Sequence, residues 1–266
     1  MPTIAHISDL HFGREETTLL NALVKSLAEV EPELVVVSGD ITQRARSYEF
    51  LAARTFLNTL RWPLLVIAGN HDIPIYRLGL RFLSPWRKWH RFFGYELEPV
   101  VRGKDFIAMG VNTVRRAGSP LDWSRGRING EQMETVAQCL NREHEAKLRI
   151  IVAHHPFWLP EAHSHRRVVG GHSQALKTLK EAGADIILGG HVHFAYTHLL
   201  QGLIISHAGT AVSNRVNSGT TNSFKVIKGN REKLLIEMNA WDGQRFTMSK
   251  RWQFSRSLGE WTSDHQ

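Results

Sequence analysis

Short apolar runs alternate with amphipathic segments through the first 70 residues. In segments 17–30 and 47–60, apolar residues recur at helical spacing and predict two helices. The apolar runs themselves predict buried strands, at residues 4–7, 34–37 and 64–67. Strands that alternate with helices are typical of a parallel sheet covered on both faces.

The alternation continues with a strand at 105–112, a helix at 131–147, a strand at 149–153, a short helix at 173–181 and a strand at 185–188. Short strand-like runs separated by Gly, Asn or Asp turns then follow, at 198–206, 222–228, 233–239 and 245–253. They predict antiparallel strands that complete a second sheet. Because no repeat or low-complexity linker divides the chain, we expect one α/β domain over residues 1–254, followed by a C-terminal tail at 255–266.

Residues 73–100 break this pattern, because basic and large aromatic side chains are mixed there and Pro85 interrupts any single helix. We expect one or two short helices that form a cap-like insertion. Two interpretations stay open. The segment is an amphipathic cover packed on the body, or residues 76–93 form a basic, aromatic lip that contacts a phosphorylated substrate or an anionic membrane surface.

Polar side chains follow five of the predicted strands. These strand ends read Asp9-Leu10-His11, Ser38-Gly39-Asp40, Gly69-Asn70-His71-Asp72, His154-His155 and Gly189-Gly190-His191-Val192-His193. Ligands of open α/β sheets bind beyond the carboxyl ends of the strands. We therefore expect these side chains to converge on one site.

The converging set supplies two carboxylates, four imidazoles and one amide oxygen, from Asp9, His11, Asp40, Asn70, His154, His191 and His193. A single catalytic metal holds fewer protein ligands, because it keeps an open position. The set suits two divalent ions (Mn, Fe or Zn) that share one carboxylate. Two such ions can hold a phosphoryl group between them and lower the pKa of a bound water, so that a bridging hydroxide serves as nucleophile. In an extended chain, residues i and i+2 point the same way. We therefore expect Asp9 and His11 to face one metal, and His191 and His193 likewise to face one metal together.

In this order, the motifs Asp-x-His, Gly-Asp, Gly-Asn-His-Asp, His-His-Pro and Gly-His-x-His resemble those of the calcineurin-like metallophosphoesterases. Gly-Asn-His-Asp and His-His-Pro are most similar to the bacterial class III cyclic nucleotide phosphodiesterase branch. The resemblance implies a four-layer α-β-β-α sandwich of two mixed sheets flanked by helices.

The resemblance also implies roles for individual residues. Asp9, His11 and His193 would hold one metal, Asn70, His154 and His191 the other, and Asp40 would bridge the two. His71 would bind the substrate phosphate and protonate or stabilise the leaving oxygen, with Asp72 available to orient it. His155 is the alternative ligand to His154.

Several basic side chains outside this set are candidate substrate contacts. They are Arg81 in the basic segment, His155, His163 and Arg166 after the fourth motif, and His207 beyond a later strand end. His207 has an alternative role supporting a metal ligand from behind.

Composition narrows the classes of protein only slightly. The net charge of +8 favours an anionic partner, which could be a phosphate substrate, nucleic acid or a lipid surface. No recognition motif for nucleic acid is present to support that partner. The single cysteine, Cys139, excludes an intramolecular disulfide. No signal peptide pattern or membrane-spanning run is present, so we expect a cytoplasmic protein, with peripheral contact at the inner membrane as an open alternative. The sequence leaves oligomerisation open.

These observations predict a dinuclear metal-dependent phosphodiesterase acting on a small phosphodiester, with a 3′,5′-cyclic nucleotide as the favoured substrate. The main alternative is a pyrophosphatase of a lipid-linked nucleotide such as UDP-2,3-diacylglucosamine, although that branch usually has Arg in place of His71. A non-catalytic scaffold on the same fold is the alternative of another class, but scaffolds would be expected to lose ligands and none is missing here.

Overall fold

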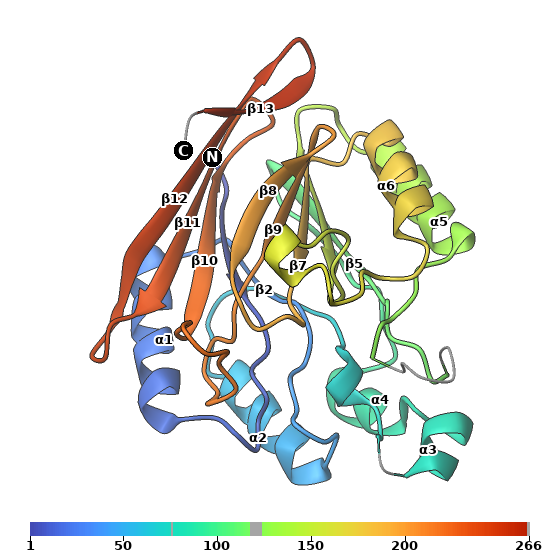
Figure 1. The fold of residues 1–266 in the computed structure, drawn as a ribbon, viewed down its shortest axis with the longest axis vertical. Helices are drawn as coiled ribbons and strands as arrows, with labels where there is room; N and C mark the ends of the chain where they lie inside the picture. Colours follow the sequence, from blue (N-terminus) through green and yellow to red (C-terminus); the bar gives the residue numbers. More distant parts are fainter. Residues whose placement is uncertain (76, 118–123, 265–266) are drawn as a thin grey trace.

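Two β-sheets pack face to face, with helices on their outer surfaces (Figure 1). The computed structural model describes residues 1–75, 77–117 and 124–264 of the 266-residue chain. The larger sheet has seven strands in the order β13-β12-β11-β10-β1-β2-β3, and the smaller has six in the order β4-β5-β6-β7-β9-β8. Both sheets are mixed, which confirms the expected four-layer architecture.

The strands span Thr3–Ile7 (β1), Leu34–Val37 (β2), Leu64–Val66 (β3), Val100–Arg102 (β4), Phe106–Val111 (β5), Leu148–Ala153 (β6), Ile186–Gly189 (β7), Tyr196–Leu200 (β8), Leu203–His207 (β9), Ser223–Gly229 (β10), Lys233–Trp241 (β11), Phe246–Ser257 (β12) and Glu260–Asp264 (β13). The helices span Thr17–Val30 (α1), Ser47–Leu57 (α2), Leu78–Leu83 (α3), Arg87–Phe93 (α4), Gly130–Asn141 (α5) and His172–Glu181 (α6). Two short 3-10 turns lie at Asn70–Asp72 and Glu161–His163.

Three apolar layers explain why these elements pack in this way. Along β2, Leu34 and Val36 face the space between the sheets, whereas Val35 and Val37 face the helices α1 and α2. The smaller sheet is covered in the same manner by α5 and α6. Strands buried on both faces therefore appear in the sequence as continuous apolar runs.

The last third of the chain departs from the expectation of a single completed sheet. Strands β10 to β13 extend the larger sheet, whereas β8 and β9 finish the smaller one. The run at 198–206 turns back at Gln201-Gly202, where both residues have positive φ, so it forms two strands and not one. The expected tail is also wrong in part, because residues 260–264 pair with β12 as strand β13.

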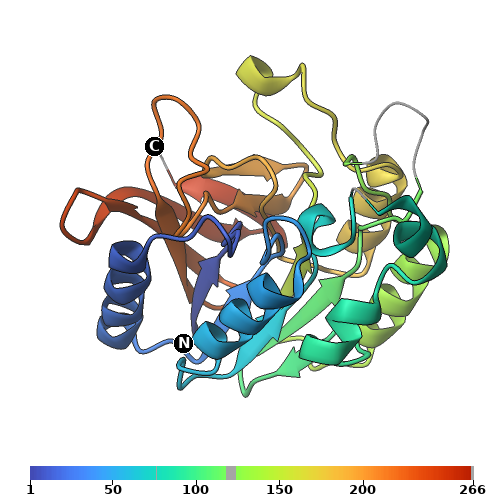
Figure 2. The same cartoon turned by 90° about the horizontal axis from the view of Figure 1, so that it is seen from below.

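The insertion contains two short helices on either side of Pro85, as expected, and α4 lies beside α2 (Figure 2). Phe92 of α4 stacks on Phe50 of α2 with ring centroids 5.6 Å apart, and Trp89 is buried. This half of the segment is a packed cover. In the described part of the chain, no helix has both the length and the apolar character that a membrane span requires.

Candidate metal centre

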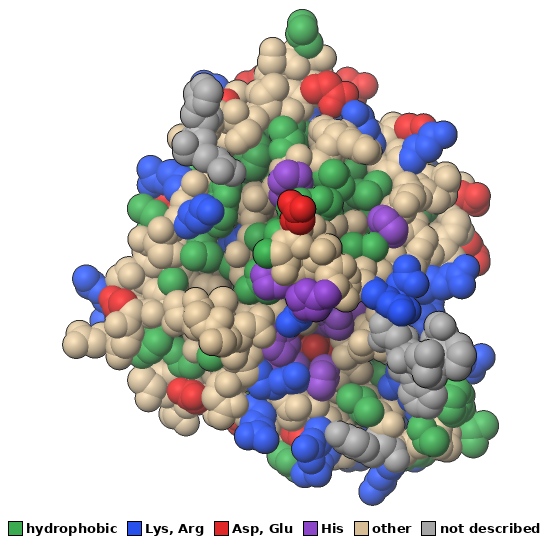
Figure 3. Space-filling model, in the orientation of Figure 1, with side chains coloured by type: hydrophobic (Ala, Val, Ile, Leu, Met, Phe, Trp, Pro, Cys, Tyr) green, Lys and Arg blue, Asp and Glu red, His purple; other side chains and the backbone are tan. Residues whose placement is uncertain are grey.

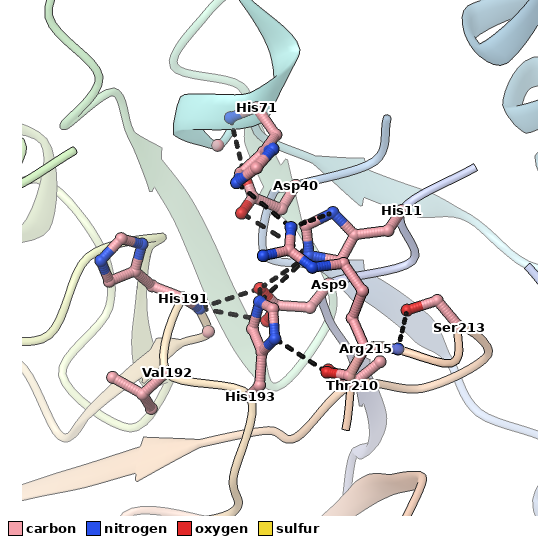
Figure 4. Close-up of polar contacts among 12 residues, drawn as sticks. Asp9, His11, Asp40, His71, His191, Val192, His193, Thr210, Ser213 and Arg215 are labelled. Atoms are coloured by element: carbon pink, nitrogen blue, oxygen red, sulfur yellow. Dashed lines mark hydrogen bonds and ion pairs between the residues drawn. The ribbon is translucent and has the colours of Figure 1, made fainter. Parts of the chain in front are cut away.

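The carboxyl ends of β1, β2 and β3 in one sheet meet those of β6 and β7 in the other, and the polar loops that follow these strands converge there (Figure 4). All seven predicted ligand side chains lie at this edge. The buried strands fix the loop positions, and the loops carry the chemistry.

One group of donor atoms surrounds Asp9. Its Oδ1 lies 3.8 Å from His11 Nε2 and 3.4 Å from His193 Nε2, and the two Nε2 atoms are 3.1 Å apart. His193 Nδ1 donates to the carbonyl of Arg215 at 2.8 Å, so the His193 Nε2 lone pair points into the group.

A second group surrounds Asn70. Its Oδ1 lies 3.3 Å from His154 Nε2 and 2.9 Å from His191 Nδ1. His154 Nδ1 donates to the Ser38 carbonyl at 2.8 Å, which directs the His154 Nε2 lone pair into this group.

The carboxylate of Asp40 joins the two groups. Its Oδ2 lies 3.8 Å from His11 Nε2 in the first group and 3.4 Å from His154 Nε2 in the second. Its Oδ1 accepts the His71 backbone N–H at 2.8 Å, which fixes the carboxylate in this orientation. This is the position that a bridging ligand requires.

The backbone of the ligand loops is unusual. Nine non-glycine residues of the described chain have positive φ, and five of them are predicted ligands: Asp9, His11, Asp40, His191 and His193. Such conformations cost about 1–3 kcal/mol each and cluster at functional sites. The expectation that these loops are locally extended is therefore wrong.

The positive φ values also separate one expected pair. His191 joins Asn70 in the second group, whereas His193 joins Asp9 in the first. The spacing argument, which placed His191 and His193 on one metal, is wrong. The division implied by the family resemblance matches the observed positions.

The site brings two buried carboxylates together among the imidazoles. Asp9 and Asp40 are almost fully buried. Burial lowers the pKa of His11 and of His191 to about 3, so both imidazoles are neutral. Burial would also lower the pKa of His154, but Asp40 outweighs it and raises that pKa to about 9. Buried carboxylates need a paired cation, so the donor set fits divalent metal ions. Oxygen and imidazole donors without thiolate suit Mn, Fe or Zn alike.

His71 lies at the open side of the site. Its Nδ1 donates to the Gln43 carbonyl at 2.8 Å, and its Nε2 atom, on the other side of the ring, faces Arg215 Nη1 at 3.2 Å. The Asp72 carboxylate does not contact this imidazole, and the expected orienting role of Asp72 is wrong. Instead, this buried carboxylate accepts backbone N–H groups of Ile41, Thr42 and Gly69, and so ties the loop after β2 to the loop after β3.

Arg215 is a site residue that the sequence did not reveal. Its Nη1 lies 3.2 Å from His71 Nε2 and 3.5 Å from His11 Nδ1 (Figure 4). It comes from the long loop between β9 and β10, which follows no motif. The only signal is its place shortly after His207, at the end of a strand that is parallel to β7.

The candidate substrate contacts divide into two kinds. Arg81 is buried and donates to the carbonyls of Pro74, Arg115 and Arg116, so it supports the insertion and is not open to substrate. His207 is also buried, and its Nδ1 donates to the Gly190 carbonyl at 2.9 Å. These two predictions are wrong as substrate contacts, and the contact of His207 with the backbone just before His191 leaves its supporting role a prediction.

The remaining candidates border the site. The His155 ring lies 4.7 Å from that of His191, and its Nδ1 is 2.6 Å from Thr113 Oγ1. Arg166 Nη1 donates to the Val192 carbonyl at 3.3 Å. The His163 ring stacks on Phe194, next to His193, with centroids 4.0 Å apart. Of the two histidines after β6, His154 is the one whose Nε2 faces Asp40.

Comparison with known proteins gives sequence relatives of two kinds. A glycerophosphodiester phosphodiesterase GpdQ of Enterobacter lignolyticus is 39% identical over 80 residues, which are 26% of this chain and 29% of that protein. A probable cyclic nucleotide phosphodiesterase of Synechococcus is 26% identical over 216 residues, covering 73% of this chain and 74% of that protein.

Solved structures share the fold at low sequence identity. A purple acid phosphatase from yellow lupin seeds superposes with a TM-score of 0.72 and 14% identity, over 97% of this chain and 54% of that one. A dimetal phosphatase from Danio rerio gives a TM-score of 0.69 and 11% identity, over 97% of this chain and 100% of that one. The family model for calcineurin-like phosphoesterases matches residues 2–195, a range that contains all five motifs. The chain therefore belongs to the calcineurin-like phosphoesterase family.

Proposed function

We propose that this protein is a phosphodiesterase that depends on two divalent metal ions and hydrolyses a small phosphodiester, with a 3′,5′-cyclic nucleotide as the favoured substrate. One observation carries the proposal: Asp40 Oδ2 lies between two separate groups of ligand atoms. The cyclic nucleotide is supported by the Synechococcus relative, which matches nearly three quarters of both chains.

The metal ligands in this proposal are Asp9, His11 and His193 on one side and Asn70, His154 and His191 on the other, with Asp40 between. When bound, two such ions polarise the phosphoryl oxygens and supply a water nucleophile at neutral pH. The remaining roles belong to the residues around them.

His71 and Arg215 form the phosphate-facing pair. Because His71 Nδ1 is committed to the Gln43 carbonyl, the Nε2 atom is the one that can exchange a proton with the leaving oxygen. Arg215 Nη1 lies 3.2 Å from that atom, where a fixed cation stabilises negative charge that develops on the phosphoryl group. Asp72 holds the backbone that carries His71, and so acts as a positioning residue.

A lipid-linked nucleotide remains the second candidate substrate, and a specific feature favours it. Leu78, Phe82 and Leu83 of α3 are exposed beside the basic residues of the insertion. Apolar side chains among cations suit an acylated ligand or an anionic membrane surface. This half of the insertion is not the packed cover that α4 forms.

The test is hydrolysis of 3′,5′-cyclic AMP and bis(p-nitrophenyl) phosphate by protein stripped of metal and reloaded with Mn²⁺. Asp40→Ala and His71→Ala are compared with Asp105→Ala and His144→Ala, matched changes at exposed residues far from the site. We expect both substrates to be cleaved, Asp40→Ala to lose bound metal and turnover, and His71→Ala to lose turnover with its metal retained.

The outcomes separate the alternatives. Cleavage of the aryl diester without cleavage of cyclic AMP would keep the phosphodiesterase and reject the cyclic nucleotide, and UDP-2,3-diacylglucosamine would be assayed next. If the reloaded protein cleaves none of these substrates, the scaffold alternative is favoured instead.

A further inference from the structure

A strongly basic cavity of about 560 Å³ lies next to the metal centre, between the loop that precedes α2 and the two helices of the insertion. Five cationic side chains line it: Arg44, Arg46, Arg77, Arg87 and Lys88. Among the described residues, no carboxylate lines the cavity. On the face shown in Figure 3, Lys and Arg side chains gather beside the histidines of the metal centre.

The cavity is held in place by the same loop that holds His71. The Gln43 carbonyl accepts from His71 Nδ1, and Arg44 is the next residue, about 3.8 Å farther along the chain between Cα atoms. Lys88 of α4 donates to the carbonyl of Ala45, which ties the insertion to this loop. The cavity therefore begins within one residue of the catalytic side of the metal centre.

Four of the five cationic side chains of the cavity lack a carboxylate partner in the described part of the chain. Among the described residues, no ion pair joins Arg46, Arg77, Arg87 or Lys88 to a carboxylate. The nearest acid, Glu49, is buried and accepts the backbone N–H groups of Arg44 and Arg46. Burial lowers the pKa of Lys88, and the charges of Arg77, Arg87 and Arg46 lower it further against an opposing contribution from Glu49. Like charges gathered around one cavity repel one another, and a bound polyanion would relieve that repulsion.

We infer that this cavity binds a second phosphate group, one carried by a ligand whose first phosphate occupies the metal centre. The inference rests on the proposed function for the first phosphate, and within that function it favours a substrate that carries a second phosphate over a cyclic nucleotide that has only one. Guanidinium groups match phosphate geometry with paired hydrogen bonds. The second phosphate comes either from a soluble nucleotide or from a lipid headgroup, since both present the same chemistry.

The first experiment measures equilibrium binding, so it does not depend on turnover. Isothermal titration calorimetry compares thymidine 5′-phosphate with thymidine 3′,5′-bisphosphate on the Mn²⁺-loaded full-length protein. A charge-assisted contact predicts that the second phosphate tightens binding about tenfold to about 100-fold. In Arg77→Gln/Arg87→Gln this gain falls to less than about threefold. In the control Arg91→Gln/Arg142→Gln, which makes the same charge change at exposed residues outside the cavity, the gain is kept.

The second experiment tests the lipid source by sedimentation with vesicles of phosphatidylcholine that contain phosphatidylinositol 4-phosphate, a lipid that carries two phosphates. If the headgroup is the ligand, vesicle binding drops about tenfold or more in Arg77→Gln/Arg87→Gln and persists in the control, while the soluble bisphosphate shows no gain. If neither probe distinguishes the cavity variant from the control, the inference is overturned. Absence of diester hydrolysis would count against the proposed function. The binding measurements would still decide whether the cavity binds phosphate, because they do not depend on turnover.

Discussion

The substitution Gly69→Ala tests the metal centre through a single methyl group. Gly69 has φ −109° and ψ 178°, a conformation that alanine adopts without strain. The added Cβ, however, would meet both the Oδ1 atom and the backbone nitrogen of Asp40 far inside the 3.4 Å of ordinary contact. The effect of the change is therefore confined to the position of Asp40.

The collision sets the size of the expected effect. To regain normal contact, both the backbone and the carboxylate of Asp40 must move by about 1 Å, and a misplacement of about 1 Å at a catalytic site can cost about 100-fold in rate. Overpacking of this kind also costs about 1–3 kcal/mol of unfolding free energy. We expect the variant to fold, to lose at least one of two bound metal ions on dialysis, and to hydrolyse bis(p-nitrophenyl) phosphate about 100-fold more slowly.

The assay combines metal content by mass spectrometry, urea unfolding and hydrolysis rates. Gly130→Ala is the matched control, because its added Cβ meets no atom within 4 Å and its residue begins helix α5. The control should keep wild-type metal content and rate. If Gly69→Ala retains both metals and full turnover, Asp40 is not the shared ligand and the reasoning fails.

Three further predictions follow from other parts of the structure. Arg215→Gln should keep its metal content and lose about 100-fold in the rate of diester hydrolysis, because it removes a fixed cation beside His71 Nε2; an unchanged rate would exclude this role. Lys225 is fully buried, and burial lowers its pKa well below 10.5. At a pH between this lowered pKa and 10.5, Lys225 is protonated in the unfolded chain and neutral in the folded one, so folding releases a proton. The stability of the wild type relative to Lys225→Met should therefore rise from about pH 8 to about pH 10 by up to about 1.4 kcal/mol per pH unit, measured by urea unfolding, and a constant difference would contradict it. Removal of metal by a chelator should lower the melting temperature and abolish hydrolysis, with both restored by Mn²⁺, because Asp9 and Asp40 are then left buried without their cations; a melting temperature that chelation leaves unchanged would argue against a metal bound at these two carboxylates.

The sequence was most informative where buried strands end. The runs at 34–37 and 64–67 appear as strands because both of their faces are covered, and the loops after them must reach the sheet edge. Asp40 and Asn70 could therefore be placed together from the sequence alone. The position of Asp40 between the two ligand groups came from the family resemblance, and the distances from its Oδ2 to His11 and His154 agree with it.

Three features were not predictable in the same way. The strands β10 to β13 have edge-to-edge partners that no local pattern specifies, so their sheet could not be assigned. The separation of His191 from His193 depends on left-handed backbone angles, with φ of 71° and 62°, which a two-residue spacing rule does not anticipate. Arg215 reaches the site from a long loop, and only tertiary packing brings it to His71.

Asp72 shows how a correct motif can lead to an incorrect role. Its place beside His71 suggests a carboxylate that orients an imidazole, but the carboxylate is occupied by three backbone N–H groups. The His71 imidazole is held by another group, because its Nδ1 donates to the Gln43 carbonyl. The part of the motif that faces the site is Asn70 and His71.

The most direct test of a shared two-metal centre is metal stoichiometry measured together with turnover in the wild type and in Asp40→Asn. This substitution preserves the shape of the side chain and removes the charge that lies between the two ligand groups. The account predicts two equivalents of divalent metal and diester hydrolysis in the wild type, with at most one equivalent and a loss of about 100-fold or more in the variant. Two tightly bound equivalents and undiminished hydrolysis in Asp40→Asn would contradict it.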